Sequence, residues 1–208
     1  MKLDLLTRRE CWTLSLRGKL LVLSLAMAFA ITAPREAYPF LAVNQPVDGE
    51  VLIVEGWIPM DVYDQAAAEF KRGHYRRVLV VGTTYDEQYK WAVNRLVKHG
   101  VPRQFVDTVV CPEVQKDRTY HAALGTKDWF IENGIRVKSF TVATLGPHAR
   151  RSRLMYEKAF GDSAEVGIVA LNDASYDSKL WWRTSHGVTE VSEEAIGYVY
   201  ARFFFAWE

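Results

Sequence analysis

Short apolar runs recur along the chain and are separated by stretches in which apolar residues return every three or four positions. The runs are VLIV at 51–54, VLVV at 78–81, FVDTVV at 105–110, SFTVATL at 139–145 and EVGIVAL at 165–171. Continuous apolar runs of this length are typical of strands buried on both faces of a parallel sheet. Between the first two, the spacing of Val62, Ala66 and Phe70 predicts a helix.

This alternation of strand and helix, repeated about five times, predicts the fold class. We expect an α/β domain with a Rossmann-like three-layer open sheet, mostly parallel, with helices on both faces. In such sheets, ligands bind beyond the carboxyl ends of the strands. Polar residues gather directly after four of the predicted strands, at 55–57, 82–84, 111–113 and 146–148. These segments are the candidate site.

The first fifty residues follow a different pattern. Residues 20–33, LLVLSLAMAFAITA, form an apolar run somewhat shorter than the roughly 20 residues of a spanning helix, and a basic leader at 1–19 precedes them. We predict an N-terminal transmembrane helix at 20–33 acting as a signal-anchor. Residues 34–50 contain three prolines and are predicted to be an extended linker, and 51–208 to be the α/β domain.

Two other interpretations of this apolar run remain open. A cleaved signal peptide would use the Ala28-Phe29-Ala30 pattern as its cleavage site, and a core helix of a soluble protein is the other alternative. The leader carries five basic and two acidic residues, whereas 34–50 carries one basic and three acidic ones. The positive-inside rule then predicts a single-pass bacterial inner-membrane protein with a cytoplasmic N-terminus and a periplasmic domain.

Composition narrows the classes of function. Lys and Arg number 26 against 25 Asp and Glu, so the charge balance gives no support for a nucleic-acid partner. The chain lacks a GxxxxGK[ST] phosphate loop, a GxGxxG fingerprint and a GxSxG elbow, and its five histidines show no HExxH or other ligand spacing. No cofactor and no metal site are predicted.

The segment TLGPHARRSR, residues 144–153, carries the clearest candidate chemistry. Gly and Pro end the fourth strand, and His148 lies in the first turn of the next helix, where backbone N–H groups favour anions. Arg151 lies three positions further on and shares a helix face with His148. We therefore predict that His148 and Arg151 hold an anion, and that Arg150 and Arg153 are solvated.

Other site residues follow from their places at strand ends. Glu55 ends the first strand, where a carboxylate can serve as general acid or base, so Glu55 and His148 are the catalytic candidates. The ligand-binding candidates are Trp57, Thr83, Glu113, Arg118, Thr119 and Arg151. In the C-terminal segment, an apolar helix face through Ile196, Val199 and Phe203 is predicted to pack against the sheet.

The order of these features resembles the ElyC/SanA/YdcF family. The resemblance rests on Glu-Gly-Trp after the first strand, HGVP at 99–102, Glu113 six positions before Thr119, and TLGPHARR after the fourth strand. It covers roughly residues 51–171 and implies a Rossmann-like sheet with a role in the bacterial envelope. The family's His and Arg fall on His148 and Arg151, and its Glu and Thr fall on Glu113 and Thr119.

The chain departs from the family pattern at three places. Where the family has Thr-x-Glu-Asn, residues 119–122 read Thr-Tyr-His-Ala. The acid of the preceding helix aligns with Gln88, and Glu-Gly-Trp at 55–57 replaces the glycine-rich turn after the first strand. These departures leave the implied fold and site location unchanged but do not carry over a reaction.

Together these features predict a membrane-anchored envelope protein. Its ligand is expected to be an anionic, phosphate-bearing glycan or lipid-linked precursor of peptidoglycan or polysaccharide, with the inner membrane as its other partner. Whether it is an enzyme stays open: a non-catalytic binding or scaffolding protein of polysaccharide assembly and a cytoplasmic nucleotide-binding domain are the alternatives. The sequence predicts neither the substrate nor the oligomeric state.

Overall fold

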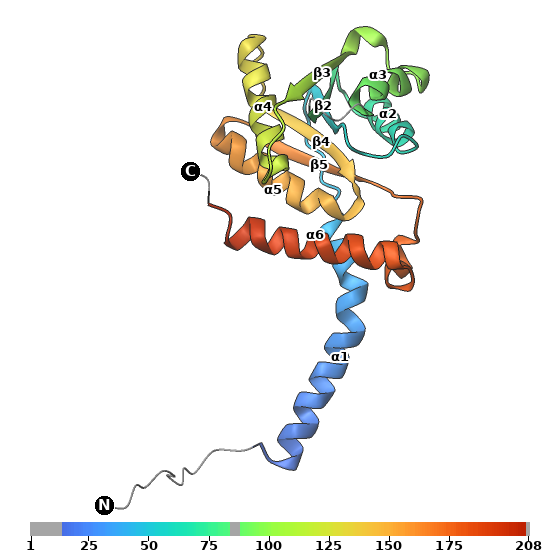
Figure 1. Cartoon of the computed structure of the whole chain (residues 1–208), viewed down its shortest axis with the longest axis vertical. Helices are drawn as coiled ribbons and strands as arrows, with labels where there is room; N and C mark the ends of the chain where they lie inside the picture. Colours follow the sequence, from blue (N-terminus) through green and yellow to red (C-terminus); the bar gives the residue numbers. More distant parts are fainter. Residues whose placement is uncertain (1–13, 84–87, 207–208) are drawn as a thin grey trace, which may run out of the picture.

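The computed structural model describes residues 14–83 and 88–206 (Figure 1). Five strands form one sheet in the order β3-β2-β1-β4-β5, and every neighbouring pair is parallel. The strands are β1 (Val51–Glu55), β2 (Arg77–Thr83), β3 (Val106–Cys111), β4 (Ser139–Leu145) and β5 (Glu165–Leu171). The predicted Rossmann-like α/β fold is confirmed.

Helices cover both faces of the sheet. One face packs against α2 (Tyr63–Arg72) and α3 (Gln88–Lys98), and the other against α4 (Arg118–Glu132) and α5 (Ala149–Phe160). Successive strand residues point to opposite faces, so in β1 the pair Leu52 and Val54 joins the first core while Val51 and Ile53 join the second. This is why the strand reads as an unbroken apolar run.

Short turns of 3-10 helix and one long helix complete the domain. The 3-10 turns are η1 (Arg103–Phe105), η2 (Gly146–His148), η3 (Gly161–Ser163) and η4 (Ser178–Arg183), and the last helix is α6 (Ser185–Phe203). The predicted packing face of α6 is wrong, because Ile196 and Phe203 are 71% and 73% exposed. Gly187, Val191 and Ala201 are buried instead. These smaller side chains let α6 approach its neighbours closely.

The helix α1 (Leu16–Leu41) projects from the domain beside α6 (Figure 1). It is the one helix in the described part of the chain that is long and apolar enough to cross a membrane, with a mean hydropathy of 1.6 in its apolar window. At about 1.5 Å per residue, its 26 residues span roughly 39 Å, more than the hydrocarbon core of a bilayer.

The predicted extended linker is wrong over its first half, because α1 continues through Pro34 and Pro39. Each proline removes one helical hydrogen bond, and contacts with the domain hold this part of α1 in place. Leu41 is buried in a cluster with Trp181, whose Nε1 donates a hydrogen bond to the Pro34 carbonyl at 2.8 Å. The end of α1 is therefore part of the domain's packing.

Arg150 contributes to this packing, so the prediction that it is solvated is wrong, whereas Arg153 remains partly exposed. The Arg150 guanidinium lies 4.0 Å from the ring centroid of Phe40 and donates to the Phe40 carbonyl. Arg153 bonds Glu157 and Gln45. Gln45 also forms an antiparallel bridge with Ile168 of β5, so the segment after α1 covers this edge of the sheet.

Candidate functional site

The carboxyl ends of β1 and β4 frame the topological switch point of the sheet. The crossover after the central strand β1 leads to β2 on one side of it. β4 lies on the other side of β1, and its crossover leads further outward to β5. Crossovers that diverge in this way leave a crevice beyond the strand ends. Glu55 is the last residue of β1, and Gly146–His148 forms η2 directly after β4. Two sequence-predicted residues, Glu55 and His148, thus meet at this point.

The Glu55 carboxylate is buried and held by three neutral donors. Its side chain is 3% exposed. It accepts hydrogen bonds from Thr144 Oγ1 at 2.5 Å, Ser152 Oγ at 2.8 Å and Trp57 Nε1 at 2.9 Å. These bonds come from β4, α5 and the turn after β1, so they fix the carboxylate between three elements.

His148 lies between two carboxylates. Its Nδ1 is 2.9 Å from both Glu194 Oε1 and Arg151 Nη2. The carboxylate accepts a proton from Nδ1, whereas the guanidinium donates to an unprotonated Nδ1, so the two contacts favour different tautomers. The other ring nitrogen, Nε2, lies 3.5 Å from both Glu55 Oε2 and Thr119 Oγ1. The Trp57 ring meets the imidazole edge to face at 4.9 Å. The ring is therefore fixed in orientation, with Nε2 directed toward Thr119.

Glu194 of α6 also binds Arg151 of α5 through two parallel bonds. Arg151 Nε donates to Oε2 at 2.8 Å and Nη2 donates to Oε1 at 2.9 Å. Burial alone would raise the pKa of Glu194, but hydrogen bonds from His148 and Arg151 outweigh it and lower that pKa to about 2. Burial likewise opposes the charge of Arg151, and its bonds with Glu194 nevertheless raise its pKa. Both groups are charged at neutral pH.

A small cavity adjoins this network, with a volume of about 60 Å³, the space of roughly two water molecules. Its lining residues are Asp117, Thr119, Tyr120, Arg151, Met155, Gly197, Tyr200 and Ala201. Asp117 precedes α4 in a left-handed conformation, with φ of 55°, and its side chain does not cap the helix. A non-glycine residue in this region is uncommon and often marks a functional site.

The structure brings together five of the eight predicted site residues. They are Glu55, Trp57, Thr119, His148 and Arg151. Glu113 and Arg118 are exposed, and neither contacts this network within the described residues. Thr83 ends β2, but its side chain lies outside the described residues.

Sequence reasoning missed three members of the network. Thr144 and Ser152 both lie within the TLGPHARRSR segment, yet neither was assigned to the site. Glu194 lies 46 positions from His148, so no local spacing announces their contact. The pattern in the sequence that could have indicated Glu194 as a site residue is the pair of acids Glu190 and Glu194, spaced one helical turn apart.

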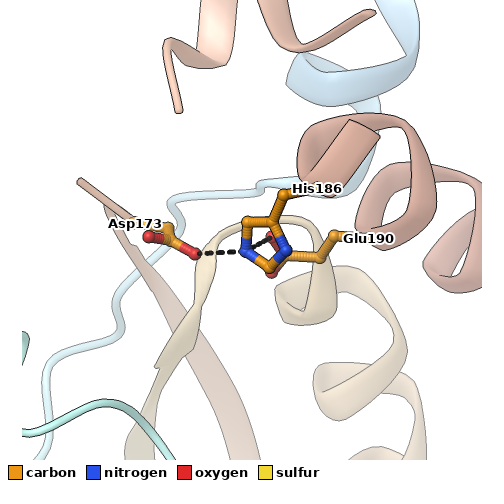
Figure 2. A group of neighbouring side chains, drawn as sticks. All are labelled: Asp173, His186 and Glu190. Carbon is orange, nitrogen blue, oxygen red and sulfur yellow. Dashed lines mark ion pairs between the residues drawn. The ribbon is translucent and has the colours of Figure 1, made fainter. Parts of the chain in front are cut away.

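A second cluster lies at the same edge of the sheet. Figure 2 shows Asp173, which follows β5, facing His186 and Glu190 from the first turns of α6. His186 Nε2 is 3.5 Å from Asp173 Oδ2 and 3.8 Å from Glu190 Oε2. The sequence-based statement that no histidine has ligand spacing overlooked His186 and Glu190, which are four residues apart on a helix.

The larger cavity lies elsewhere. It has a volume of about 660 Å³ and is lined by residues 48–51, 74–76 and 135–139. Val51 and Ser139 begin β1 and β4, so this cavity is at the amino ends of the strands, opposite the switch point. It therefore does not belong to the site around His148.

No protein-family model matches the chain, and a search of curated proteins found no match. The resemblance to the ElyC/SanA/YdcF family stays a prediction.

Proposed function

We propose that this protein is a membrane-anchored acid–base enzyme of the bacterial envelope. Its substrate is an anionic, phosphate-bearing glycan or lipid-linked precursor used in peptidoglycan or polysaccharide biogenesis. The observation that carries the proposal is His148 at the switch point, with Nδ1 held by Glu194 and Nε2 directed toward Glu55 and Thr119.

An imidazole fixed in this orientation can accept one proton and donate it again. In the tautomer whose Nδ1 donates to Glu194, Nε2 is the nitrogen that can accept a proton from a hydroxyl or water placed beside Thr119. Glu55 Oε2, 3.5 Å away, then stabilises the imidazolium that forms. General base catalysis by such a group contributes typically 10²–10⁴-fold in rate.

Arg151 supports an anionic substrate. Its pairing with Glu194 uses Nε and Nη2, so the Nη1 amino group takes no part in it. The side chain is 27% exposed and lines the small cavity beside Thr119. A phosphoryl oxygen entering this cavity would meet a guanidinium, while the rest of a glycan or lipid carrier stays outside.

The membrane location is supported by two features. α1 can span a bilayer by length and composition, and the basic leader before it favours a cytoplasmic N-terminus and a periplasmic domain. Ile196 and Phe203 of α6 and the adjoining Phe204 are exposed, and Tyr198 on another face of α6 contacts Phe40 of α1. Such an apolar helix side fits a bilayer surface.

One observation favours a second candidate function, non-catalytic binding or scaffolding. Glu55 already accepts three hydrogen bonds, so the network can also serve to tie β1, β4 and α5 together. In that case the same cavity would hold a phosphate group without transforming it.

The first experiment separates these functions. The full-length protein in detergent is mixed with sugar phosphates, polyprenyl phosphate and polyprenyl pyrophosphate, and both thermal stabilisation and phosphate release are measured. We expect His148→Gln to lower phosphate release by 100-fold or more while ligand stabilisation changes little. His121→Gln, an exposed histidine of α4, is the matched control. Stabilisation without release supports the binding protein, and the absence of both refutes a phosphate-bearing ligand.

The second experiment tests orientation. An alkaline phosphatase fused to the C-terminus is active only outside the cytoplasm, and a green fluorescent protein fused there fluoresces only inside. We expect phosphatase activity. Fluorescence with an inactive phosphatase would instead support the cytoplasmic nucleotide-binding alternative.

A further inference from the structure

Asp173, His186 and Glu190 present one imidazole nitrogen and two carboxylate oxygens to a common point, with all three atoms within 4.8 Å of one another (Figure 2). We propose that this cluster binds a divalent transition-metal ion such as Mn²⁺ or Zn²⁺. Mixed imidazole and carboxylate ligands suit these ions, whereas Mg²⁺ and Ca²⁺ prefer oxygen ligands alone.

The cluster carries more negative charge than the protein compensates. Asp173 is 8% exposed, and Oε2 of Glu190 is buried without a hydrogen-bond partner. Among the described residues, the one basic side chain paired with these two carboxylates is His186. Buried carboxylates are usually paired or bound to a metal. A bound cation would supply the missing charge.

Tyr176 provides an independent sign of a missing ligand. Its side chain is 7% exposed, and its buried hydroxyl makes no hydrogen bond of normal geometry, although it lies beside the Glu190 carboxyl. The Tyr176 ring lies edge to face with His186 at 5.7 Å, and the charge of Glu190 is, after burial, the largest influence on its hydroxyl. A buried hydroxyl without a partner is costly, and a water on the ion would satisfy it.

Two of the three distances between the ligand atoms are close to those around a bound ion. Bonds of about 2.1 Å place the ligand atoms of a tetrahedral or octahedral ion roughly 3.0–3.4 Å apart. His186 Nε2 is now 3.5 Å from Asp173 Oδ2 and 3.8 Å from Glu190 Oε2. Asp173 Oδ1 accepts from the Ser175 amide at 2.7 Å, which orients Oδ2 toward the imidazole. His186 is 60% exposed, so solvent or a substrate can reach the open positions of the ion.

The ion would lie close to the network around His148. Glu190 and Glu194 are one turn apart on α6, about 6 Å along its axis. Arg151 is paired with Glu194, so its Nη1 can donate a hydrogen bond to a phosphate but adds little net positive charge. A divalent ion at the second cluster would add that charge at the same edge of the sheet. This last step rests on the proposed function; metal binding itself does not.

The test measures metal binding directly. The full-length protein in detergent is treated with a chelator, dialysed and titrated with Mn²⁺ alone and with Zn²⁺ alone, using calorimetry and the electron paramagnetic resonance signal of free Mn²⁺. We expect one ion per chain and a higher Tm with metal. Asp173→Asn, His186→Gln and Glu190→Gln should each weaken binding by more than tenfold.

Glu193→Gln, an exposed carboxylate on the same helix, is the matched control and should bind the ion as the parent protein does. Equal affinity in all variants, loss of binding in Glu193→Gln as well, or no saturable binding would overturn the proposal and leave a simple ion pair of His186 with its two acids. His148→Gln should retain the metal, so a failure of the proposed chemistry and a failure of this site are distinguishable.

Discussion

Glu190 and Glu194 occupy successive turns of α6 and have opposite electrostatic surroundings. Burial raises the pKa of both carboxyls. At Glu194, bonds from His148 and Arg151 reverse that effect and lower the pKa to about 2. At Glu190, only Tyr176 and His186 oppose it, and the pKa stays raised. Close hydrogen bonds from His148 and Arg151 thus separate a satisfied ion pair from a carboxylate that still lacks a cation.

The largest effect is expected from removing that arginine. Arg151→Met leaves Glu194 buried with only His148, and breaking a buried ion pair in this way costs about 3–5 kcal/mol of unfolding free energy. Chemical denaturation of the full-length protein in detergent measures it. The double variant Arg151→Met/Glu194→Gln should recover most of the loss. If it does not, the pair is not the source of the stability.

Lowering the pH should selectively remove the stability that Glu194 contributes. Because its folded pKa is lowered, Glu194 contributes stability that is present above about pH 4.5 and lost as the pH falls toward 2. The difference between these two values corresponds to on the order of 3 kcal/mol. Denaturation between pH 6 and pH 2 should show a shallower decline for Glu194→Gln. Parallel curves for the two proteins would contradict this assignment.

The stability that Glu190 contributes should depend on pH in the opposite sense to that of Glu194. A carboxyl with a raised folded pKa stabilises the protein at low pH, and this contribution is lost as the pH rises through that pKa. In metal-free protein, Glu190→Gln should therefore be neutral or stabilising at pH 7, by up to about 1 kcal/mol. With Mn²⁺ present the order should reverse, and the parent protein should melt at the higher temperature. Destabilisation in both conditions would argue against an uncompensated carboxylate.

The smallest effect is expected at an exposed pair on the same helix as Arg151. Arg153 Nε bonds Glu157 Oε1 at 2.8 Å, with 30% and 44% of the side chains exposed. Solvent screens such a pair, so Glu157→Gln should change the unfolding free energy by roughly 0–0.5 kcal/mol. The change in unfolding free energy for Glu157→Gln is the reference with which the changes for the other three variants are compared. A loss comparable with that of Arg151→Met would remove the distinction between buried and exposed pairs.

The fold could be predicted because strand and helix patterns are local. Residues 51–54 and 165–171 read as buried strands because both faces of the sheet are covered, and the structure has strands there. The end of α1 could not be predicted, because two prolines argue against a helix and only contacts with Trp181 explain why it continues. The outward side of α6 was mistaken for a core face because apolar periodicity does not say which side meets a partner.

The site was predictable only where its residues adjoin a strand end. Glu55 and His148 follow β1 and β4, and parallel strands bring their carboxyl ends to one edge. Arg151 shares a helix face with His148 and was found by spacing. Asp173 adjoins the end of β5, but Glu194 and the partners of Asp173 belong to α6, and periodicity carries no information on how that helix crosses the domain.

The unbroken passage of α1 into the domain has a consequence for how the protein meets its surroundings. A domain on a flexible tether tumbles, and its open edge faces every direction in turn. Here the helix runs to Leu41 inside the packed cluster of Trp181 and Val191, so a rotation or tilt of the helix must turn the whole sheet with it. A bilayer holding α1 would thereby set the distance of the switch point from the membrane and the direction in which it faces. Substrates carried by lipids would approach it along a fixed path.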